Sequence, residues 1–310
     1  MSTSKAFIFM QRRVGLLSLI VMLSPSAVYA AERGPLSFEL RAGVQHDSNV
    51  VVEQTDVNTS RADVAVLLGA SAKYRFAKFG KTELSAGYSF DETANVDLTD
   101  YDLQIHRASL EGTTRIGKAT IGADTRFFHI LLGGKPFLNM HTVSPSISGF
   151  VSKDLFLRGG YTHLRKVFST AKGLDAYTRS ADASASYFFM RRLGYFNLAL
   201  RYERERTTDP TRAFDGLQVS GNILIPGDKV AKGSKLRLGI AYRDRWYKNI
   251  TPSIGEPRHE ERVSINASAD IPIFKHVILR PEYRMADRAS NDPFRNYDNT
   301  ISSLSVVYNF

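Results

Sequence analysis

The 310-residue sequence contains no cysteine. This absence excludes disulfides, thiolate metal sites and cysteine nucleophiles, and it also excludes a lipoprotein anchor, which requires a cysteine after the cleavage site. After residue 30, no run approaches the ~18 consecutive apolar residues of a helical membrane span. No segment sustains the 3.6-residue repeat of an amphipathic helix. The sequence therefore excludes a disulfide-stapled domain and a bundle of membrane helices.

The spaced motifs of common enzymes are missing as well. The seven histidines show no HExxH or HxxEH spacing, and there is no GxSxG and no glycine-rich phosphate loop. The acidic stretch around residues 91–100 does not have the spacing of an EF-hand. We therefore expect no enzyme, no catalytic residue, no cofactor and no metal. A hydrolase whose Ser-His-acid triad assembles from distant segments is the alternative that a sequence leaves open.

The N-terminus has the three parts of a secretory signal. Lys5, Arg12 and Arg13 precede an apolar run at 14–23, and Ala-Val-Tyr-Ala at 27–30 resembles a cleavage site. We predict cleavage near Ala30, so that residues 1–30 are a signal peptide and residues 31–310 are the exported domain. An uncleaved anchor helix is the alternative, but the run is short for a span.

From residue 36 to residue 310, apolar and aromatic residues recur at every second position. The last segment places Leu304, Val306, Tyr308 and Phe310 on one face of a strand. We count about fourteen such strands, joined alternately by short turns and longer polar loops. This pattern predicts an all-β fold: a transmembrane antiparallel barrel in the outer membrane of a Gram-negative cell, with both termini periplasmic. A soluble β-sandwich would also alternate and is the competing fold.

Two strand details are specific expectations. The terminal strand should pair with the first strand and present its aromatic end to the barrel-assembly machinery. In the segment near 101–116, Tyr101, Leu103 and Ile105 are expected to face outward, after which the pattern changes face. That change predicts a β-bulge.

The second face of the strands is strongly charged and is expected to line the interior. Its charged residues are Glu39, Arg41, Lys73, Arg75, Glu83, Asp124, Arg126, Arg158, Asp182, Arg201, Glu203, Arg237, Arg243, Arg245, Arg262, Asp270, Arg280, Glu282 and Arg284. In one interpretation, opposite charges pair across the lumen and brace the wall. In the other, unpaired arginines form a positive lining that contacts anions or an acidic polymer. The candidate lining residues are Arg237, Arg243, Arg245, Arg262, Arg280 and Arg284.

The net charge of the exported part limits the classes of partner that the chain is expected to bind. The chain carries 41 basic and 31 acidic residues; three of the basic ones lie in the predicted signal, which leaves 38 minus 31, or +7, on the exported part. Export argues against nucleic acid, so the expected partners are anionic: lipopolysaccharide phosphates outside, or an acidic solute or polymer in the lumen. Outer-membrane lipid is expected around the barrel.

The first strand ends in Ala-Gly-Val-Gln-His-Asp-Ser-Asn-Val at 42–50. This segment resembles the G-Y-D-S-N opening of the barrel domain in surface lipoprotein assembly modifiers, and related openings occur in exopolysaccharide-export barrels. The resemblance implies a fourteen-stranded barrel, with a periplasmic repeat protein as partner and a lipoprotein or polysaccharide as cargo. Here Gln45 and His46 stand where that family has an aromatic residue, and no helical-repeat domain is expected before the first strand. Asp47, Ser48 and Asn49 also suit a strand-ending Asx turn.

The leading functional prediction is a porin-like or export channel that passes hydrophilic cargo, which is anionic if the arginines form a positive lining. The alternative is a non-conducting barrel that serves as the outer-membrane component of a surface lipoprotein or exopolysaccharide machine.

Overall fold

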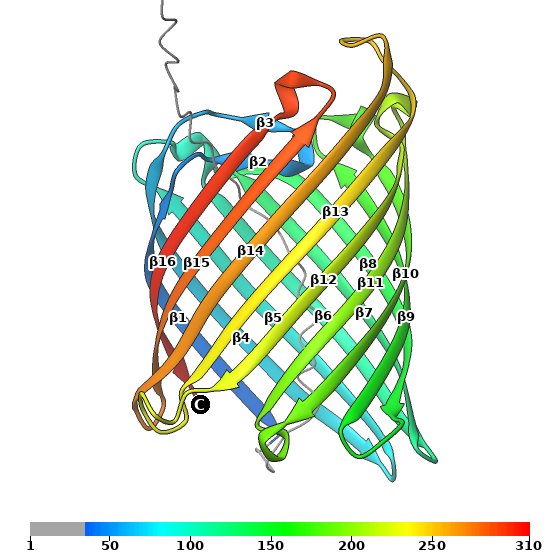
Figure 1. The fold of residues 1–310 in the computed structure, drawn as a ribbon. Helices are drawn as coiled ribbons and strands as arrows, with labels where there is room; N and C mark the ends of the chain where they lie inside the picture. The colour runs from blue at the N-terminus through cyan, green and yellow to red at the C-terminus, as the bar shows by residue number, and fades with distance from the viewer. Residues whose placement is uncertain (1–34) are drawn as a thin grey trace, which may run out of the picture.

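The computed structural model describes residues 35–310, and the predicted signal peptide lies outside them. The described chain forms a closed antiparallel barrel of fourteen strands (Figure 1). These strands are β1 (Leu36–Asp47), β4 (Asp63–Phe79), β5 (Thr82–Asn95), β6 (Leu103–Ile116), β7 (Ala119–Leu132), β8 (Lys135–Phe150), β9 (Leu155–Phe168), β10 (Ala176–Phe189), β11 (Gly194–Thr207), β12 (Phe214–Pro226), β13 (Lys235–Thr251), β14 (Glu256–Phe274), β15 (Val277–Ser290) and β16 (Tyr297–Asn309). The fold predicted from the period-two pattern is confirmed.

The remaining elements are short and lie in connections. A two-stranded sheet of β2 (Val51–Val52) and β3 (Val57–Asn58) follows β1, with the 3-10 turn η1 (Glu53–Thr55) between them. Other 3-10 turns are η2 (Thr99–Tyr101), η3 (Lys172–Leu174), η4 (Met190–Arg192), η5 (Pro210–Arg212) and η6 (Pro293–Arg295). Within residues 35–310, no helix is long and apolar enough to cross a membrane.

The barrel closes between its first and last strands. Leu40 pairs with Tyr308 and Val44 with Leu304 in an antiparallel ladder. The ladder continues to the end of the chain, where the backbone N–H of Phe310 donates to the Phe38 carbonyl at 2.9 Å. The predicted pairing of the terminal strand with the first strand is therefore confirmed, whereas its recognition by an assembly machine stays a prediction.

The two faces of the wall differ as the alternation requires. Apolar residues on the outward positions are exposed on every barrel strand, including Val64, Val66 and Leu68 on β4 and Leu236, Leu238 and Ile240 on β13. A closed sheet has no free edge, and an apolar outer surface suits lipid rather than water. Leu304, Val306, Tyr308 and Phe310 all belong to this exposed outer surface.

Strand β6 corrects one expectation. Its pairing with β5 and β7 shows no register shift, so there is no bulge where the pattern changes face. Leu103 and Ile105 point inward and pack against a buried cluster inside the barrel, while Leu110 is exposed outside. The apparent change of face arose because apolar residues occupy inward positions at this end of the strand.

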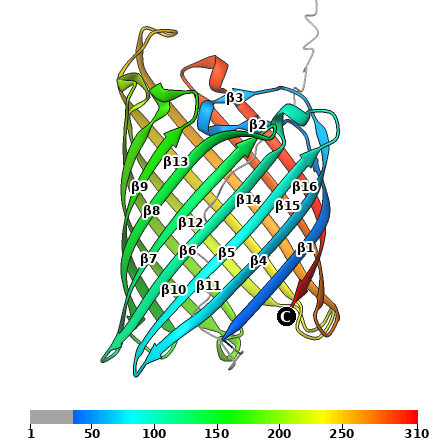
Figure 2. The same ribbon diagram turned by 180° about the vertical axis from the view of Figure 1, so that it is seen from behind.

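The two ends of the barrel differ in their connections. One end carries compact turns such as 80–81, 117–118 and 275–276, and the chain end at Phe310 lies there (Figures 1 and 2). The other end carries the longest connection, 48–62, which contains β2, η1 and β3. The connection between β7 and β8 at this end is a two-glycine turn at 133–134.

Candidate functional site at the barrel mouth

Residues 48–62, called here the mouth loop, follow β1, and the Asp47-Ser48-Asn49 motif joins the strand to the loop. The Asn49 backbone N–H donates to the Asp47 carboxylate at 3.0 Å, which is the predicted Asx turn. The Asn49 side chain donates to Asn58 at 2.6 Å and thereby links the two ends of the loop. Ser48 exchanges two hydrogen bonds with Thr300 of β16. The motif therefore fixes the direction in which the loop leaves the wall.

The mouth loop lies across the end of the barrel instead of projecting away from it. In Figures 1 and 2, β2 and β3 extend over the opening at the end with the long connections. Val51 is buried against Ala286 of β15 and Tyr297 of β16. Val50, Val51 and Val52 are all buried, although they belong to a loop. Burial of these apolar side chains holds the segment inside the rim.

Asp56 is the main polar contact of the mouth loop. Its carboxylate accepts from Arg212 at 2.7 Å and from Arg288 at 2.9 Å, and Arg258 lies at 3.3 Å. The Arg295 side chain donates to the Asp56 backbone carbonyl at 3.1 Å. These arginines come from β14, β15 and the connections before β12 and β16. One carboxylate therefore joins four separate segments of the rim.

The charges around Asp56 determine its protonation state. Burial alone would raise the pKa of this carboxyl, but the attraction of Arg288, Arg258 and Arg295 outweighs burial and holds the pKa well below its usual range. Asp56 is thus ionised throughout the pH range of a living cell. The contacts between Asp56 and the arginines are therefore ion pairs between fully charged groups.

Glu53 makes a second contact between the loop and the same wall. It forms an ion pair with Arg262 of β14. A pocket with an empty volume of about 300 Å³ lies beside this pair, lined by Glu53, Arg243, Arg245, Glu260, Arg262, Arg288 and Tyr297. We call this space the arginine pocket. Inside it, Glu260 is bound by Arg288 and also contacts Arg258 at 3.1 Å and Tyr247 at 3.2 Å.

Five of the six arginines proposed as an unpaired lining have carboxylate partners. Arg237 and Arg280 both bind Asp270 at 2.7 Å, and Arg245 lies 3.2 Å from Glu203. Arg262 pairs with Glu53, and Arg284 pairs with Glu282. The expectation that they are unpaired is wrong for these five, because neighbouring strands and the loop supply counter-charges.

Arg243 is the exception. Among the described residues it has no carboxylate within the 4.0 Å of an ion pair, and its neighbours in the pocket include Arg245 and Arg262. Elsewhere on the wall the bracing pattern holds: Arg41 pairs with Asp91, Lys73 with Glu111, Arg75 with Glu83, Arg126 with Asp124, and Arg158 with Asp182. Pairing of opposite charges therefore accounts for most of the inward charged residues, and a lining that contacts anions stays a prediction.

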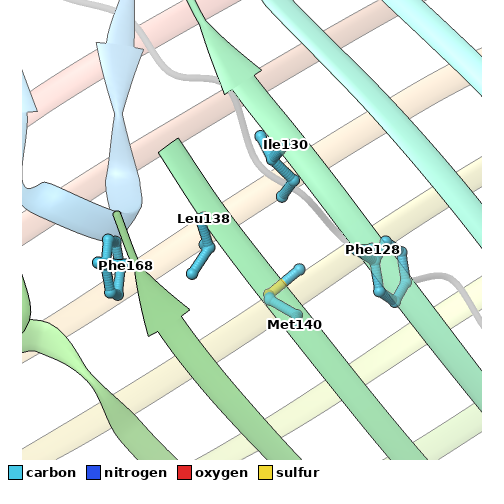
Figure 3. Close-up of a cluster of buried hydrophobic side chains, with 5 residues drawn as sticks. All are labelled: Phe128, Ile130, Leu138, Met140 and Phe168. Atoms are coloured by element: carbon cyan, nitrogen blue, oxygen red, sulfur yellow. The ribbon is translucent and has the colours of Figure 1, made fainter. Parts of the chain in front are cut away.

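The opposite side of the mouth is apolar. Figure 3 shows Phe128 and Ile130 on β7, Leu138 and Met140 on β8, and Phe168 on β9, which form a buried cluster. A second pocket, with an empty volume of about 620 Å³ partly open to solvent, separates this side from the mouth loop. Its lining includes Val50 and Val52 from the loop and Leu103, Ile130 and Phe137 from the wall. The mouth thus has one charged side and one apolar side.

A group of possible metal ligands lies on the outer wall, away from the lumen. Asp244, His259 and Glu261 bring one ligand atom each to within 4.8 Å of one another. Protein contacts already occupy them: His259 lies 2.6 Å from Asp244, and the Tyr242 hydroxyl donates to Glu261 at 2.6 Å. Trp246 also stacks on His259. Sequence reasoning did not identify this group, because its members lie on two strands.

Comparison with known proteins establishes the fold and nothing finer. No protein-family model and no curated protein matches the chain. Among solved structures, the anion-selective porin from Comamonas acidovorans is 10% identical with a TM-score of 0.51, and covers 89% of this chain and 98% of its own. The OmpTdeltaL8 loop-deletion mutant, an outer-membrane protein of Vibrio cholerae, is 9% identical with a TM-score of 0.54 over 89% of this chain and 99% of its own. This is the fold of an outer-membrane β-barrel.

A third match is a bacterial polysaccharide outer-membrane secretin, 10% identical with a TM-score of 0.50 over 88% of this chain and 98% of that one. The specific resemblance to surface lipoprotein assembly modifiers stays a prediction.

In this outer-membrane barrel, sequence reasoning missed five residues of the site: Glu53, Asp56, Arg258, Glu260 and Arg288. The available signal for the arginines was their spacing of four positions, at 258 and 262 on β14 and at 280, 284 and 288 on β15.

Proposed function

We propose that this chain is an outer-membrane channel that passes hydrophilic, anionic solutes. The observation that carries the proposal is the row of arginines on the inner face of β13, β14 and β15, called here the arginine ladder. It consists of Arg237, Arg243, Arg245, Arg258, Arg262, Arg280, Arg284 and Arg288. The ladder extends from the mouth toward the end of the barrel with the compact turns.

Ion pairing does not cancel the positive charge of the ladder. The inner positions of the same strands offer fewer carboxylates, chiefly Glu260, Asp270 and Glu282, and Asp270 serves two arginines at once. Arg243 has no carboxylate partner among the described residues. A wall with one sign of charge in excess raises the local concentration of oppositely charged solutes. Such a ring or row of arginines is also how pores select anions.

The size of the barrel agrees with a passage. Side chains fill the interior of eight-stranded barrels, whereas porins with sixteen or more strands leave a water-filled lumen. Fourteen strands lie between these limits, so the mouth loop and the inward side chains decide how wide the passage is. The exposed apolar exterior supports a position in the outer membrane.

Reversal potentials in a planar bilayer test this proposal. We expect the refolded wild-type barrel to prefer chloride over potassium in a salt gradient. The combined substitutions Arg243→Ala, Arg245→Ala and Arg284→Ala should lower the chloride-to-potassium permeability ratio about twofold or more, because they remove charge from the lumen wall. Arg158→Ala is the control, since this inward arginine lies on β9, away from the ladder, and pairs with Asp182 on the neighbouring strand β10. An unchanged ratio in the triple variant would remove the support for anion selection.

A second function rests on the mouth loop. Because this loop lies across the opening and Asp56 binds Arg288 of β15 and Arg212 before β12, a closed barrel that anchors a surface lipoprotein or polysaccharide machine is also supported. Conductance separates the two functions. A folded, heat-modifiable barrel that gives no channel events would favour the anchoring component, and a periplasmic partner would then be sought by co-purification.

A further inference from the structure

We infer that the arginine pocket is a binding site for a compact oxyanion group, a carboxylate or a phosphate, and that Glu53 of the mouth loop occupies this site as an internal stand-in for that group. This inference rests on the proposed channel function, which it deepens by naming the chemical group that the passage would hold. It assigns different roles to the two acids of the loop: Glu53 is exchangeable and Asp56 is the anchor.

The pocket offers donors that the protein does not use. Arg262 is only 6% exposed, yet its Nε and Nη2 atoms have no hydrogen-bond partner among the described residues. Arg288 is 7% exposed, and its Nε atom also has no hydrogen-bond partner among the described residues. Buried donors left without partners are costly, and those on charged groups cost most. An oxyanion that takes the place of the Glu53 carboxylate can therefore bring acceptor atoms to donors that Glu53 leaves unused.

The charges in the pocket also favour an added anion. Arg243, Arg245, Arg262 and Arg288 face Glu53 and Glu260, and the carboxylate of Glu260 is already bound by Arg288 and Arg258. Arg245 is directed to Glu203 at 3.2 Å. Arg243 has no carboxylate partner in the described part of the chain, and the partner of Arg262 is Glu53. These two arginines are thus the ones best able to bind an added anion. Guanidinium groups bind carboxylates and phosphates through paired N–H donors, which suits a small oxyanion.

Of the two carboxylates in the pocket, that of Glu53 can move away from the wall without unfolding a strand. It lies in η1 of the mouth loop, whereas Glu260 lies within β14 between ladder hydrogen bonds. The loop does not depend on Glu53 alone, since Asp56 holds it to Arg212, Arg258 and Arg288 and Val51 is buried against β15 and β16. An incoming anion can therefore replace the Glu53 carboxylate while the rest of the loop stays in place.

Titration calorimetry with inorganic phosphate on the refolded full barrel in detergent tests the inference. Wild-type protein should bind phosphate at one site. Glu53→Gln should raise the phosphate affinity about tenfold, because the competing carboxylate is gone. Arg262→Gln and, separately, Arg243→Gln should each lower it about tenfold or more. Asp182→Asn and Arg158→Gln are the matched controls, because they alter a similar inward ion pair on the other side of the lumen, and they should leave phosphate binding unchanged.

The pattern across variants decides the outcome. Equal phosphate affinity in wild type and Glu53→Gln, or an equal loss in Arg262→Gln and Arg158→Gln, would overturn the inference. Acetate titrations that follow the same order would assign the site to oxyanions in general, whereas phosphate binding without acetate binding would assign it to phosphate. Migration on unheated gels shows that each variant has folded.

Calorimetry and conductance also separate this inference from the proposed function. Phosphate binding that depends on Arg262 in a barrel without channel events would sustain the site and refute the channel. Channel events with anion preference, but no phosphate binding that responds to Glu53 or Arg262, would sustain the channel and refute the site.

Discussion

At the scale of single residues, Asp56 decides where the mouth loop rests. Its backbone is in the left-handed region, with φ of 56°, and its N–H donates to the Glu53 carbonyl at 3.2 Å. Aspartate is one of the few residues with a side chain that adopts this conformation readily. The turn directs the carboxylate at Arg288 of β15 and Arg258 of β14.

Replacing Asp56 with asparagine should release the loop. Arg258 and Arg288 are buried and would lose a common counter-charge, and breaking such a pair costs about 3–5 kcal/mol, of which Glu260 compensates a part. We expect amide hydrogens in 48–62 to exchange with deuterium much faster in Asp56→Asn than in wild type. Asp182→Asn removes an inward carboxylate from the other wall and should leave them protected. Equal protection in both variants would contradict an anchoring role.

The lowered pKa of Asp56 predicts how the loop responds to acid. A group whose pKa is lower in the folded state than its ordinary value of about 3.9 contributes its stabilisation above that value, and loses it only as the pH falls through the folded value. The loop should therefore stay protected from pH 7 to pH 4. Hydrogen exchange, corrected for the pH dependence of the intrinsic rate, measures this. Opening with a midpoint near pH 5 would point to another titrating group.

Part of the site could be predicted from residues alone and part could not. Inward arginines follow from the alternation, which identified Arg243 and Arg262 correctly as lumen residues. The partner of Arg262 did not follow, because Glu53 lies 209 positions away, and Asp56 likewise lies 156 positions from Arg212 and 232 positions from Arg288. A single sequence carries no signal for contacts between segments so far apart. The length of the mouth loop could be predicted from the sequence. Its path across the opening could not, because it depends on contacts with distant segments.

At the scale of strands and connections, the period-two pattern predicted the wall well because one face must meet lipid. It failed at β6, where Leu103 and Ile105 are apolar for a different reason, namely contact with the inner cluster that contains Ile130 and Leu138. The alternation shows that the two faces of a strand lie in different environments. It does not show which face meets lipid and which faces the lumen. Strand number and the closing pair were predictable because each strand repeats the same rule.

The closing pair of strands depends on Gly43 of β1. A Cβ atom at this position would lie 2.4 Å from the Ser305 hydroxyl oxygen and 2.6 Å from the Leu304 carbonyl oxygen. Gly43→Ala should therefore lower the stability of the folded barrel by about 1–3 kcal/mol, the usual cost of overpacking. Urea titration of the liposome-refolded protein measures the change. Gly159→Ala on β9, where the nearest atom is 4.0 Å away, is the control and should unfold at the wild-type midpoint.

At the scale of the whole molecule, the mouth loop lies across one end of the barrel. Replacing residues 51–60 with a short Gly-Ser linker removes Glu53, Asp56 and the buried Val51 and Val52 together. In the proposed channel, single-channel conductance should then rise about twofold or more, because the loop no longer lies across the opening. An equivalent replacement of residues 228–232 at the other end is the control and should change conductance little. Equal conductance in the wild type and the 51–60 variant would show that another part of the lumen is limiting.

The path of the mouth loop has a consequence for the seam of the barrel. Neighbouring strands elsewhere are joined by a turn, but β1 and β16 are adjacent through hydrogen bonds alone. The loop that leaves β1 crosses this seam: Ser48 bonds to Thr300 of β16, and Asp56 reaches Arg288 of β15 and Arg295 in the connection between β15 and β16. It therefore acts as a clasp that fastens the last hairpin to the first strand. Parting the first and last strands sideways, into the membrane, requires that this clasp be undone first.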